Sequence, residues 1–216
     1  MIGGLSEGGI EVNDIDLATS PLLYYAAKKN KYKSGIMITG SHNPKNHNGI
    51  KLIIDDKPVS GSEILDLIIS KDFKFSESVG STKSLNVKDN YIEEVSQSLK
   101  INKKLKIVID CGNGAAGFIA PDLYKNLGCE VIELYSDVDG DFPNHHPDPG
   151  KVENLKDLTQ AVKTHDADLG LAFDGDGDRV GMVTNNGEIV FPDKILMILS
   201  KDVLESQKGS IIFDVK

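Results

Sequence analysis

Strand-like and helix-like segments alternate through the second half of the chain, and this alternation constrains the fold more than any other feature. Strands are expected at residues 105–110, 130–134 and 169–173, and helices between them at 116–127 and 152–164. A strand, a helix and a further strand in series form parallel pairs, with the helices packed on the sheet. The sequence therefore predicts an α/β fold with mixed or mainly parallel sheets flanked by helices.

The first part of the chain also mixes the two kinds of segment, so the α/β prediction covers both parts. Strands are expected at residues 35–39 and 50–54, and a helix at 21–29. A second helix at 62–69 has a plausible N-terminal cap in Ser60 or Ser62.

A polar stretch rich in serine and lysine, residues 71–90, interrupts the pattern before a helix expected at 91–99. Such a composition is typical of a domain boundary. We therefore expect one domain over residues 1–86, a second over 87–189, and the start of a third over 190–216. The third would contain only a helix at 191–204 and a strand at 210–215, which cannot bury an adequate core.

Charge and composition exclude several classes of partner. The 216 residues include 24 basic and 33 acidic side chains, a net charge of −9. This balance argues against binding to nucleic acid or to an anionic membrane surface. Neither a signal peptide nor an apolar run of membrane-spanning length is visible, so a cytoplasmic protein is expected. Cys111 and Cys129 are expected to be small buried residues rather than a disulfide.

Three aspartates, Asp174, Asp176 and Asp178, are each separated by one glycine and lie between two apolar segments. The glycines let the carboxylates converge, and converging carboxylates repel one another unless a cation joins them. Hard oxygen ligands suit Mg²⁺, and the next residue, Arg179, can hold a phosphate. A solvated acidic turn is the alternative. A calcium EF-hand is excluded, because its sixth and twelfth positions would be Arg179 and Asn185 rather than Gly and Glu.

In a second polar stretch, TGSHNPKNHNGIK at residues 39–51, Ser41 closely follows the apolar run 36–38. A serine hydroxyl is a weak nucleophile unless it is activated, and Ser-His-Asn-Pro is also good turn chemistry. The hydrolase motif G-x-S-x-G does not fit, because Asn43 stands where its last glycine would be. No Walker A motif is present either. From these residues alone, Ser41 is either a carrier of phosphate or a structural turn residue.

Taken together, TGSHNP, NGIK and GLAFDGDGDRVGMV resemble the α-D-phosphohexomutases, and more narrowly the bacterial phosphomannomutase/phosphoglucomutase branch. The stretches DGDFPNHHPDPGKVENLKD at 139–157 and FPDKILMILSKDVL from Phe191 also resemble that branch. The resemblance covers essentially the whole chain. It departs at His47, where the family has an aromatic residue before the NG pair.

This resemblance implies a role for each matching position. Ser41 would carry the phosphoryl group, and the three aspartates would hold Mg²⁺ together with that phosphate. Lys51 would be a candidate general acid/base and a phosphate contact. His42 and Asn43 would lie beside the phosphoserine, and Arg179 would bind phosphate. Lys51 can accept a proton only if its pKa is lowered, and its alternative is an ordinary solvated lysine.

The reaction implied is an intramolecular phosphotransfer that interconverts hexose 1-phosphates and hexose 6-phosphates through a hexose 1,6-bisphosphate. Mannose and glucose phosphates are the expected substrates, and phosphoglucosamine mutase, which has similar motifs, is an alternative. The family has four related domains. By that comparison the chain lacks the start of domain I, most of domain III and all of domain IV. We therefore expect little turnover from the chain alone, or a non-catalytic fragment that needs a second polypeptide.

A function of another class is suggested by GNGAAG at residues 112–117, which follows a strand and precedes a helix. With Glu133 at the end of the next strand, it matches the dinucleotide-binding fingerprint. An NAD-binding oxidoreductase or a nucleotide-binding domain is therefore the alternative, although it leaves Ser41 and the acidic stretch unused. The prolines around His145, His146 and Asp148 favour a fixed structural loop, such as one at a domain interface, over a metal site.

Overall fold

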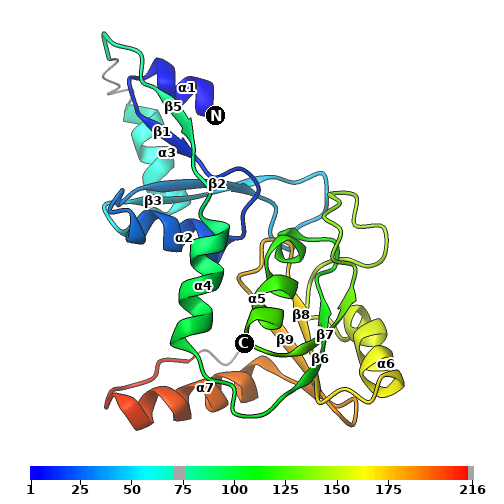
Figure 1. Ribbon diagram of the computed structural model, residues 1–216. Helices are drawn as coiled ribbons and strands as arrows, with labels where there is room; N and C mark the ends of the chain where they lie inside the picture. The colour runs from blue at the N-terminus through cyan, green and yellow to red at the C-terminus, as the bar shows by residue number, and fades with distance from the viewer. Residues whose placement is uncertain (71–75, 214–216) are drawn as a thin grey trace.

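The computed structural model describes residues 1–70 and 76–213, which form two α/β regions connected by helix α4 (Lys88–Ser98). In Figure 1 the first region occupies the upper part of the molecule and the second the lower right. Helix α4 runs between them, and α7 (Pro192–Ser206) extends from the second region toward the lower left. Among the helices of the described residues, none is both long enough and apolar enough to cross a membrane.

The first region contains two small sheets. Strands β2 (Gly35–Thr39), β3 (Gly49–Ile54) and β4 (Lys57–Pro58) form an antiparallel sheet in that order. Strands β1 (Val12–Asp14) and β5 (Thr82–Ser84) form a separate parallel pair. The parallel arrangement predicted for the second part does not extend to β2 and β3, because the loop between them contains no crossover helix.

Three helices accompany these sheets: α1 (Ile2–Glu7), α2 (Ser20–Lys29) and α3 (Gly61–Ser70). Helix α3 begins at a capping box. The backbone N–H of Ser60 donates to Glu63 at 2.7 Å, and that of Glu63 donates to Ser60 Oγ at 3.3 Å. Ser60 is therefore the cap, of the two serines that the sequence suggested.

The second region is built on a five-stranded sheet in the order β10-β9-β8-β6-β7. Strand β6 is parallel to both β7 and β8, whereas β9 and β10 are added antiparallel at one edge. The five strands are β6 (Lys106–Asp110), β7 (Glu130–Leu134), β8 (Leu169–Phe173), β9 (Val180–Thr184) and β10 (Ile189–Val190). The prediction of a mixed or mainly parallel sheet is confirmed, and its parallel part consists of β6, β7 and β8.

Both faces of β6 are buried, so the second region has three layers. Ile107 and Ile109 point to one face and pack with Ala120 at the start of α5 (Ala120–Asn126). Val108 points to the other face and packs with residues of α6 (Lys156–Thr164). This alternation follows from the two-residue period of a strand, and it makes β6 the rigid centre of the region.

The predicted cysteines lie in this core. Cys111 and Cys129 are both buried and free of disulfides. Burial raises the pKa of the Cys111 thiol to about 12, so this thiol stays protonated and unreactive. The prediction of two buried apolar residues is confirmed.

Two predicted helices are split. The first breaks into a 3₁₀ turn, η1 (Ala115–Phe118), and α5, because Pro121 lacks the N–H that a continuous helix needs but is well suited to a first turn. The second begins with a 3₁₀ turn, η2 (Val152–Leu155), that continues directly into α6.

Two further predictions fall partly outside the described residues. The polar stretch 71–90 includes β5 and the start of α4, so it is not a plain linker, and residues 71–75 are not described. The strand predicted at 210–215 is wrong over residues 210–213, which have no strand partner and leave Ile212 94% exposed. Residues 214–216 lie outside the described residues.

Candidate active site

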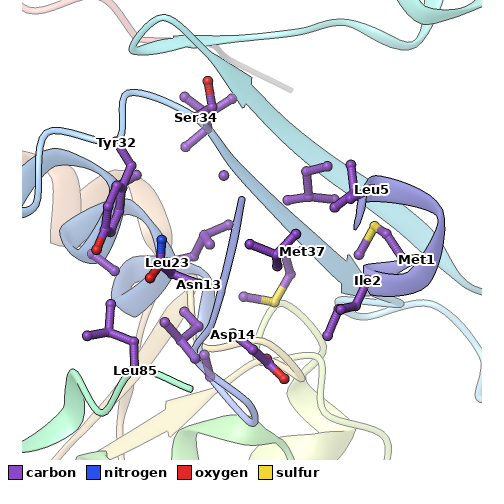
Figure 2. Close-up of a pocket in the computed structure, with 18 of the residues that line it drawn as sticks. Met1, Ile2, Leu5, Asn13, Asp14, Leu23, Tyr32, Ser34, Met37 and Leu85 are labelled. Atoms are coloured by element: carbon purple, nitrogen blue, oxygen red, sulfur yellow. The ribbon is translucent and has the colours of Figure 1, made fainter. Parts of the chain in front are cut away.

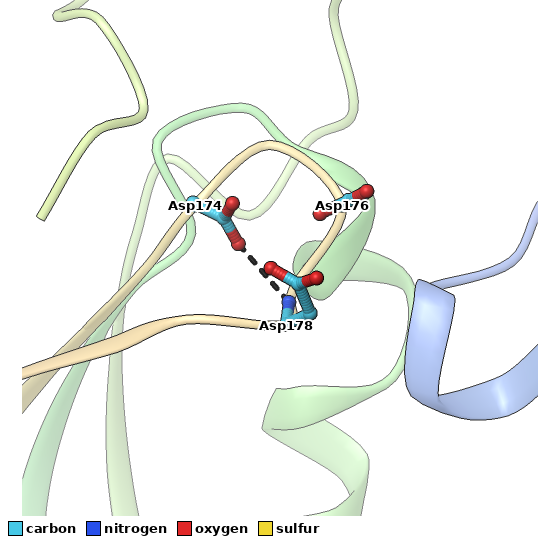
Figure 3. Close-up of side chains that lie close together, drawn as sticks. All are labelled: Asp174, Asp176 and Asp178. Atoms are coloured by element: carbon cyan, nitrogen blue, oxygen red, sulfur yellow. Dashed lines mark hydrogen bonds between the residues drawn. The ribbon is translucent and has the colours of Figure 1, made fainter. Parts of the chain in front are cut away.

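The three aspartates lie on the tight loop between β8 and β9, and their side chains converge (Figure 3). Asp174 organises the loop: its Oδ1 accepts hydrogen bonds from the backbone N–H groups of Asp178 (3.0 Å) and Arg179 (3.1 Å). Gly177 has a φ of 72°, which favours glycine. Asp174 and Asp176 are buried and Asp178 is exposed, so the site opens to solvent at Asp178.

The two glycine-containing turns of the second region pack against each other. The N–H of Ala115 donates to the carbonyl of Gly175 at 2.8 Å. A Cβ on Gly114 would lie 2.8 Å from that same carbonyl oxygen, closer than side chains come. Glycine at 114 is therefore needed so that the acidic loop can approach the end of β6.

Ser41 lies two residues beyond the end of β2, in the first region, and faces this loop. Its Oγ donates to Asp174 Oδ2 at 2.9 Å, although the two residues are 133 positions apart in the sequence. Ser41 has a φ of 50°, in the left-handed region, which costs a non-glycine residue about 1–2 kcal/mol. A hydrogen bond from its N–H to Thr39 Oγ1 (2.8 Å) supports this turn. Strain of this kind, held by surrounding contacts, is typical of functional sites.

Lys51 reaches the same carboxylates from β3. Its Nζ lies 2.7 Å from Asp176 Oδ2 and 2.6 Å from Asp178 Oδ2. Ser20 and Thr39 each donate to Asp176 Oδ2 at 2.9 Å. Two elements of the first region, α2 and the β2–β3 hairpin, therefore close over the acidic loop of the second.

The aspartates titrate differently because their neighbours differ. Burial raises the pKa of the Asp174 carboxyl, against hydrogen bonds from the N–H of Arg179 and the hydroxyl of Ser41. Burial acts in the same direction on Asp176, but hydrogen bonds from Lys51, Ser20 and Thr39 outweigh it and lower the pKa of that carboxyl.

The ammonium of Lys51 responds to the same contacts. Burial acts to lower its pKa, but the hydrogen bonds to Asp176 and Asp178 outweigh this effect and raise it. Lys51 could act as a base only if its pKa were lowered. In this structure the pKa of Lys51 is raised instead. In this arrangement Lys51 is a cation that can donate a proton.

The acidic loop has the ligand set of a divalent cation site. One carboxylate oxygen from each of Asp174, Asp176 and Asp178 lies within 4.8 Å of the others. Two ligands on opposite sides of one Mg²⁺ would be about 4 Å apart. Asp176 Oδ1 is buried and has no hydrogen-bond partner in the described part of the chain. A buried carboxylate oxygen without a partner is unfavourable unless a cation binds it, so the residues fit a hard cation.

The other predicted site residues lie around this centre. His42 Nδ1 lies 3.2 Å from Ser41 Oγ. The side chains of Asn43 and Arg179 are exposed and have no hydrogen-bond or ion-pair partner within residues 1–70 and 76–213. Both are therefore free to meet a ligand at the open side.

Sequence reasoning missed three contributors: Ser20, Thr39 and His146. Ser20 and Thr39 bond to Asp176, as described above, and His146 Nε2 contacts the carbonyl oxygen of His42. Serine and threonine are common at helix starts and strand ends, so the presence of Ser20 and Thr39 at such positions does not indicate a site. The HHPD motif draws attention to His146 in the sequence. The residue that His146 contacts, His42, lies 104 positions away.

The HHPD loop has the structural role that its prolines predict. His145 Nε2 lies 3.0 Å from Asp110 Oδ2, and Asp110 is fully buried at the end of β6. Among the described residues, the group Asp174, Asp176 and Asp178 is the only set of three or more His, Cys, Asp or Glu side chains that could hold one metal ion. His145, His146 and Asp148 do not form such a set.

The glycine-rich turn at residues 112–117 is filled by the protein itself. A Cβ on Gly117 would lie 1.9 Å from the carbonyl oxygen of Ser136. The turn leads into η1, and α5 begins only at Ala120. Glu133, the candidate ribose ligand, pairs with Lys125 at 2.6 Å. The turn thus supports the acidic loop, and the dinucleotide-binding interpretation is not favoured.

A cavity of about 740 Å³ lies elsewhere, between β1 and β2 in the first region. Its lining is mostly apolar and includes Leu5, Leu23 and Met37 (Figure 2). None of the acidic-loop residues lines it, so the cavity is separate from the carboxylate centre.

Comparisons with known proteins agree with this geometry. Residues 1–75 match the family described as phosphoglucomutase/phosphomannomutase, alpha/beta/alpha domain I, and residues 89–187 match domain II of the same family. The chain is 51% identical over its full length to a phosphomannomutase/phosphoglucomutase of Pseudomonas syringae pv. tomato. It is 46% identical over 99% of its length to a phosphoglucomutase of Neisseria gonorrhoeae.

A similar solved structure is that of a phosphoglucomutase/phosphomannomutase family protein from Burkholderia thailandensis. It is 40% identical, with a TM-score of 0.87 over 94% of this chain and 46% of that one. The chain spans about half the length, 47%, of the curated relatives that it matches.

Proposed function

Because this chain belongs to the α-D-phosphohexomutase superfamily, we propose that it takes part in interconverting the 1-phosphates and 6-phosphates of mannose or glucose. The observation that carries the proposal is the 2.9 Å contact between Ser41 Oγ and Asp174 across two regions. That contact brings a candidate phosphoryl carrier and a candidate cation site together. The names of the relatives support the choice of sugars.

In this proposal Ser41 carries the phosphoryl group. The free hydroxyl of a hexose monophosphate attacks the phosphorus, the bond from phosphorus to Ser41 Oγ breaks, and Ser41 regains its proton as the sugar hydroxyl loses one. The resulting hexose 1,6-bisphosphate turns over in the site. It then returns its other phosphoryl group to Ser41 by the reverse step, so that no further reactant is consumed.

We propose Mg²⁺ as the cation, held by Asp174, Asp176, Asp178 and the phosphate on Ser41. Phosphoserine brings a charge of roughly −1.5 to −2 next to three carboxylates, an arrangement that repels itself without a cation. When bound, Mg²⁺ neutralises charge on the phosphoryl oxygens as the group is transferred. The unpartnered oxygen of Asp176 supports this assignment.

The remaining residues are proposed to move protons and to hold phosphate. Lys51, held as a cation by Asp176 and Asp178, is the proposed proton donor and a phosphate contact. His42, 3.2 Å from Ser41 Oγ, is proposed to exchange a proton with that oxygen. The exposed side chains of Asn43 and Arg179 are proposed phosphate ligands, and a guanidinium group binds phosphate well because it offers two parallel donors.

The test is phosphopeptide mapping of the 216-residue chain after incubation with glucose 1,6-bisphosphate and Mg²⁺. Because the chain spans about half the length of its relatives, the readout is phosphate on the protein rather than sugar turnover. We expect phosphate on the peptide that contains Ser41 and none on a Ser41→Ala variant. Phosphate that appears elsewhere, or equally on the variant, would overturn the proposal.

A further inference from the structure

The proline-rich loop at residues 139–149 holds the Ser41 loop from the side of the second region. His146 Nε2 contacts the carbonyl oxygen of His42, and since a carbonyl can only accept, the imidazole is the donor. At the exposed rim, Lys45 Nζ lies 2.9 Å from Asp141 Oδ1. We infer that His146 is a positioning residue that fixes the backbone at His42, the residue after Ser41, so that Ser41 Oγ faces the acidic loop. The inference rests on the proposed role of Ser41.

The residue just before this contact, Ser41, is in a strained backbone conformation. Ser41 has a φ of 50°, and its own carbonyl oxygen lies so close to Gly175 that a Cβ there would be 2.2 Å from it. The carbonyl groups of Ser41 and His42 therefore both face the second region. One is held by close packing and the other by the imidazole of His146.

His146 is itself held in place by the core of the second region. His145 Nδ1 lies 3.0 Å from the carbonyl oxygen of His146 and donates to it, while His145 Nε2 donates to Asp110 at 3.0 Å. Asp110 is fully buried at the end of β6. The ring of Phe142 lies edge-on to that of His146, with centroids 6.4 Å apart.

These contacts form a continuous connection from the buried centre of the sheet to the serine loop. Asp110 fixes His145, His145 fixes the backbone of His146, and the imidazole of His146 fixes the backbone of His42. Pro147, fully buried between Gly112 and Gly175, limits the freedom of the same loop. A small displacement of a reacting group reduces rates by up to about a hundredfold, so such a connection has a chemical consequence.

The experiment compares His146→Ala with His146→Gln in the 216-residue chain, with His165→Ala as the matched control. Glutamine carries an N–H donor at a similar reach to Nε2, and His165 is an exposed histidine at the end of α6. Amide hydrogen exchange of residues 40–48 reports the order of the loop. The rate at which Ser41 gains phosphate from glucose 1,6-bisphosphate reports its position.

In His146→Ala we expect faster exchange in residues 40–48 and phosphate transfer slowed by about tenfold or more. His146→Gln should restore both quantities toward wild type, and His165→Ala should change neither. If His146→Ala has the exchange and transfer rates of wild type, the inference is overturned. It is also overturned if His146→Gln folds but does not restore these rates. If wild-type Ser41 takes no phosphate, the proposed function fails, and the exchange data alone decide whether His146 orders the loop.

Discussion

The two regions contribute to the same site with very different degrees of burial. Four of the five residues of β6 are buried, whereas none of the five residues of β2 is. Asp174 and Asp176 are 0% and 3% exposed, while Ser41 is only partly buried on a strained turn. The second region therefore acts as a rigid frame for the candidate cation site, and the first presents the serine against that frame.

Removing the buried carboxylate of Asp110, at the centre of the second region, should cause the largest loss of stability. Asp110→Ala leaves His145 without its buried carboxylate partner, and removing one member of a buried pair costs about 3–5 kcal/mol. Urea unfolding measures the loss. Glu133→Gln, which removes the partly exposed partner of Lys125, is the control and should have a much smaller effect. Equal losses in the two variants would show that the frame is not centred on Asp110.

Adding a cation should stabilise the folded chain through the acidic loop. At a Mg²⁺ concentration a hundred times the dissociation constant, the gain is about 2.7 kcal/mol. Thermal unfolding with Mg²⁺ and after chelation measures it. Asp176→Asn should lose this response, because it alters the carboxylate whose Oδ1 has no hydrogen-bond partner in the described residues. An unchanged response in Asp176→Asn would place the cation elsewhere.

Adding one methyl group should separate the two regions. In Gly175→Ala the new Cβ would lie 2.2 Å from the carbonyl oxygen of Ser41, so one backbone has to move. Overpacking of this kind costs about 1–3 kcal/mol, and we expect Ser41 to accept phosphate more slowly. Gly61→Ala, where no atom lies within 4 Å of the new Cβ, is the control for urea unfolding and phosphate transfer. Matching results for the two variants would refute the close contact.

The stability of the frame should also depend on pH through His145. The hydrogen bond to Asp110 raises the pKa of His145 above its ordinary 6.5, with smaller support from Asp157 and opposition from burial. Because the folded pKa is the higher one, the stabilisation is complete below pH 6.5 and is lost as the pH rises through the raised pKa. Unfolding measured across this range should show a decline in wild type that His145→Gln lacks. Parallel pH profiles would contradict the prediction.

The smallest effect is expected at the exposed rim between the regions. Lys45 and Asp141 are 60% and 75% exposed at the side chain, and exposed ion pairs contribute little because water and salt screen them. Lys45→Ala should leave stability and phosphate transfer unchanged within error. A loss of stability or phosphate transfer comparable to that of His146→Ala would contradict this prediction. It would show that the two regions are held together at the exposed rim rather than at the buried loop.

Much of the scaffold could be predicted from local patterns. The expected boundaries of β2, β7 and β8 coincide with those of the structure. Strands β2 and β8 are mostly apolar, and Gly40 and Asp174 follow them directly. The three-residue strands β1 and β5 were not predicted. Each pairs only with a partner 70 positions away, and short polar strands such as Thr82–Ser84 have no alternation that marks them.

The candidate site was predicted to the extent that its residues lie in compact motifs. Ser41 and the three aspartates were identified from two short stretches, and the structure brings them together. Ser20, Thr39 and His146 were missed because their partners lie 156, 137 and 104 residues away. The direction of the Lys51 pKa shift also depends on such distant contacts, so the sequence alone left it open.

The most direct test of the account is the ³¹P spectrum of the chain phosphorylated by glucose 1,6-bisphosphate, recorded as Mn²⁺ replaces Mg²⁺. If the serine of the first region and the carboxylates of the second form one site, the phosphoserine signal should broaden at low Mn²⁺ concentration in wild type. It should stay sharp at that concentration in Asp176→Asn. A phosphoserine signal that stays sharp in wild type, or broadens equally in the variant, would show that phosphate and cation do not share this site.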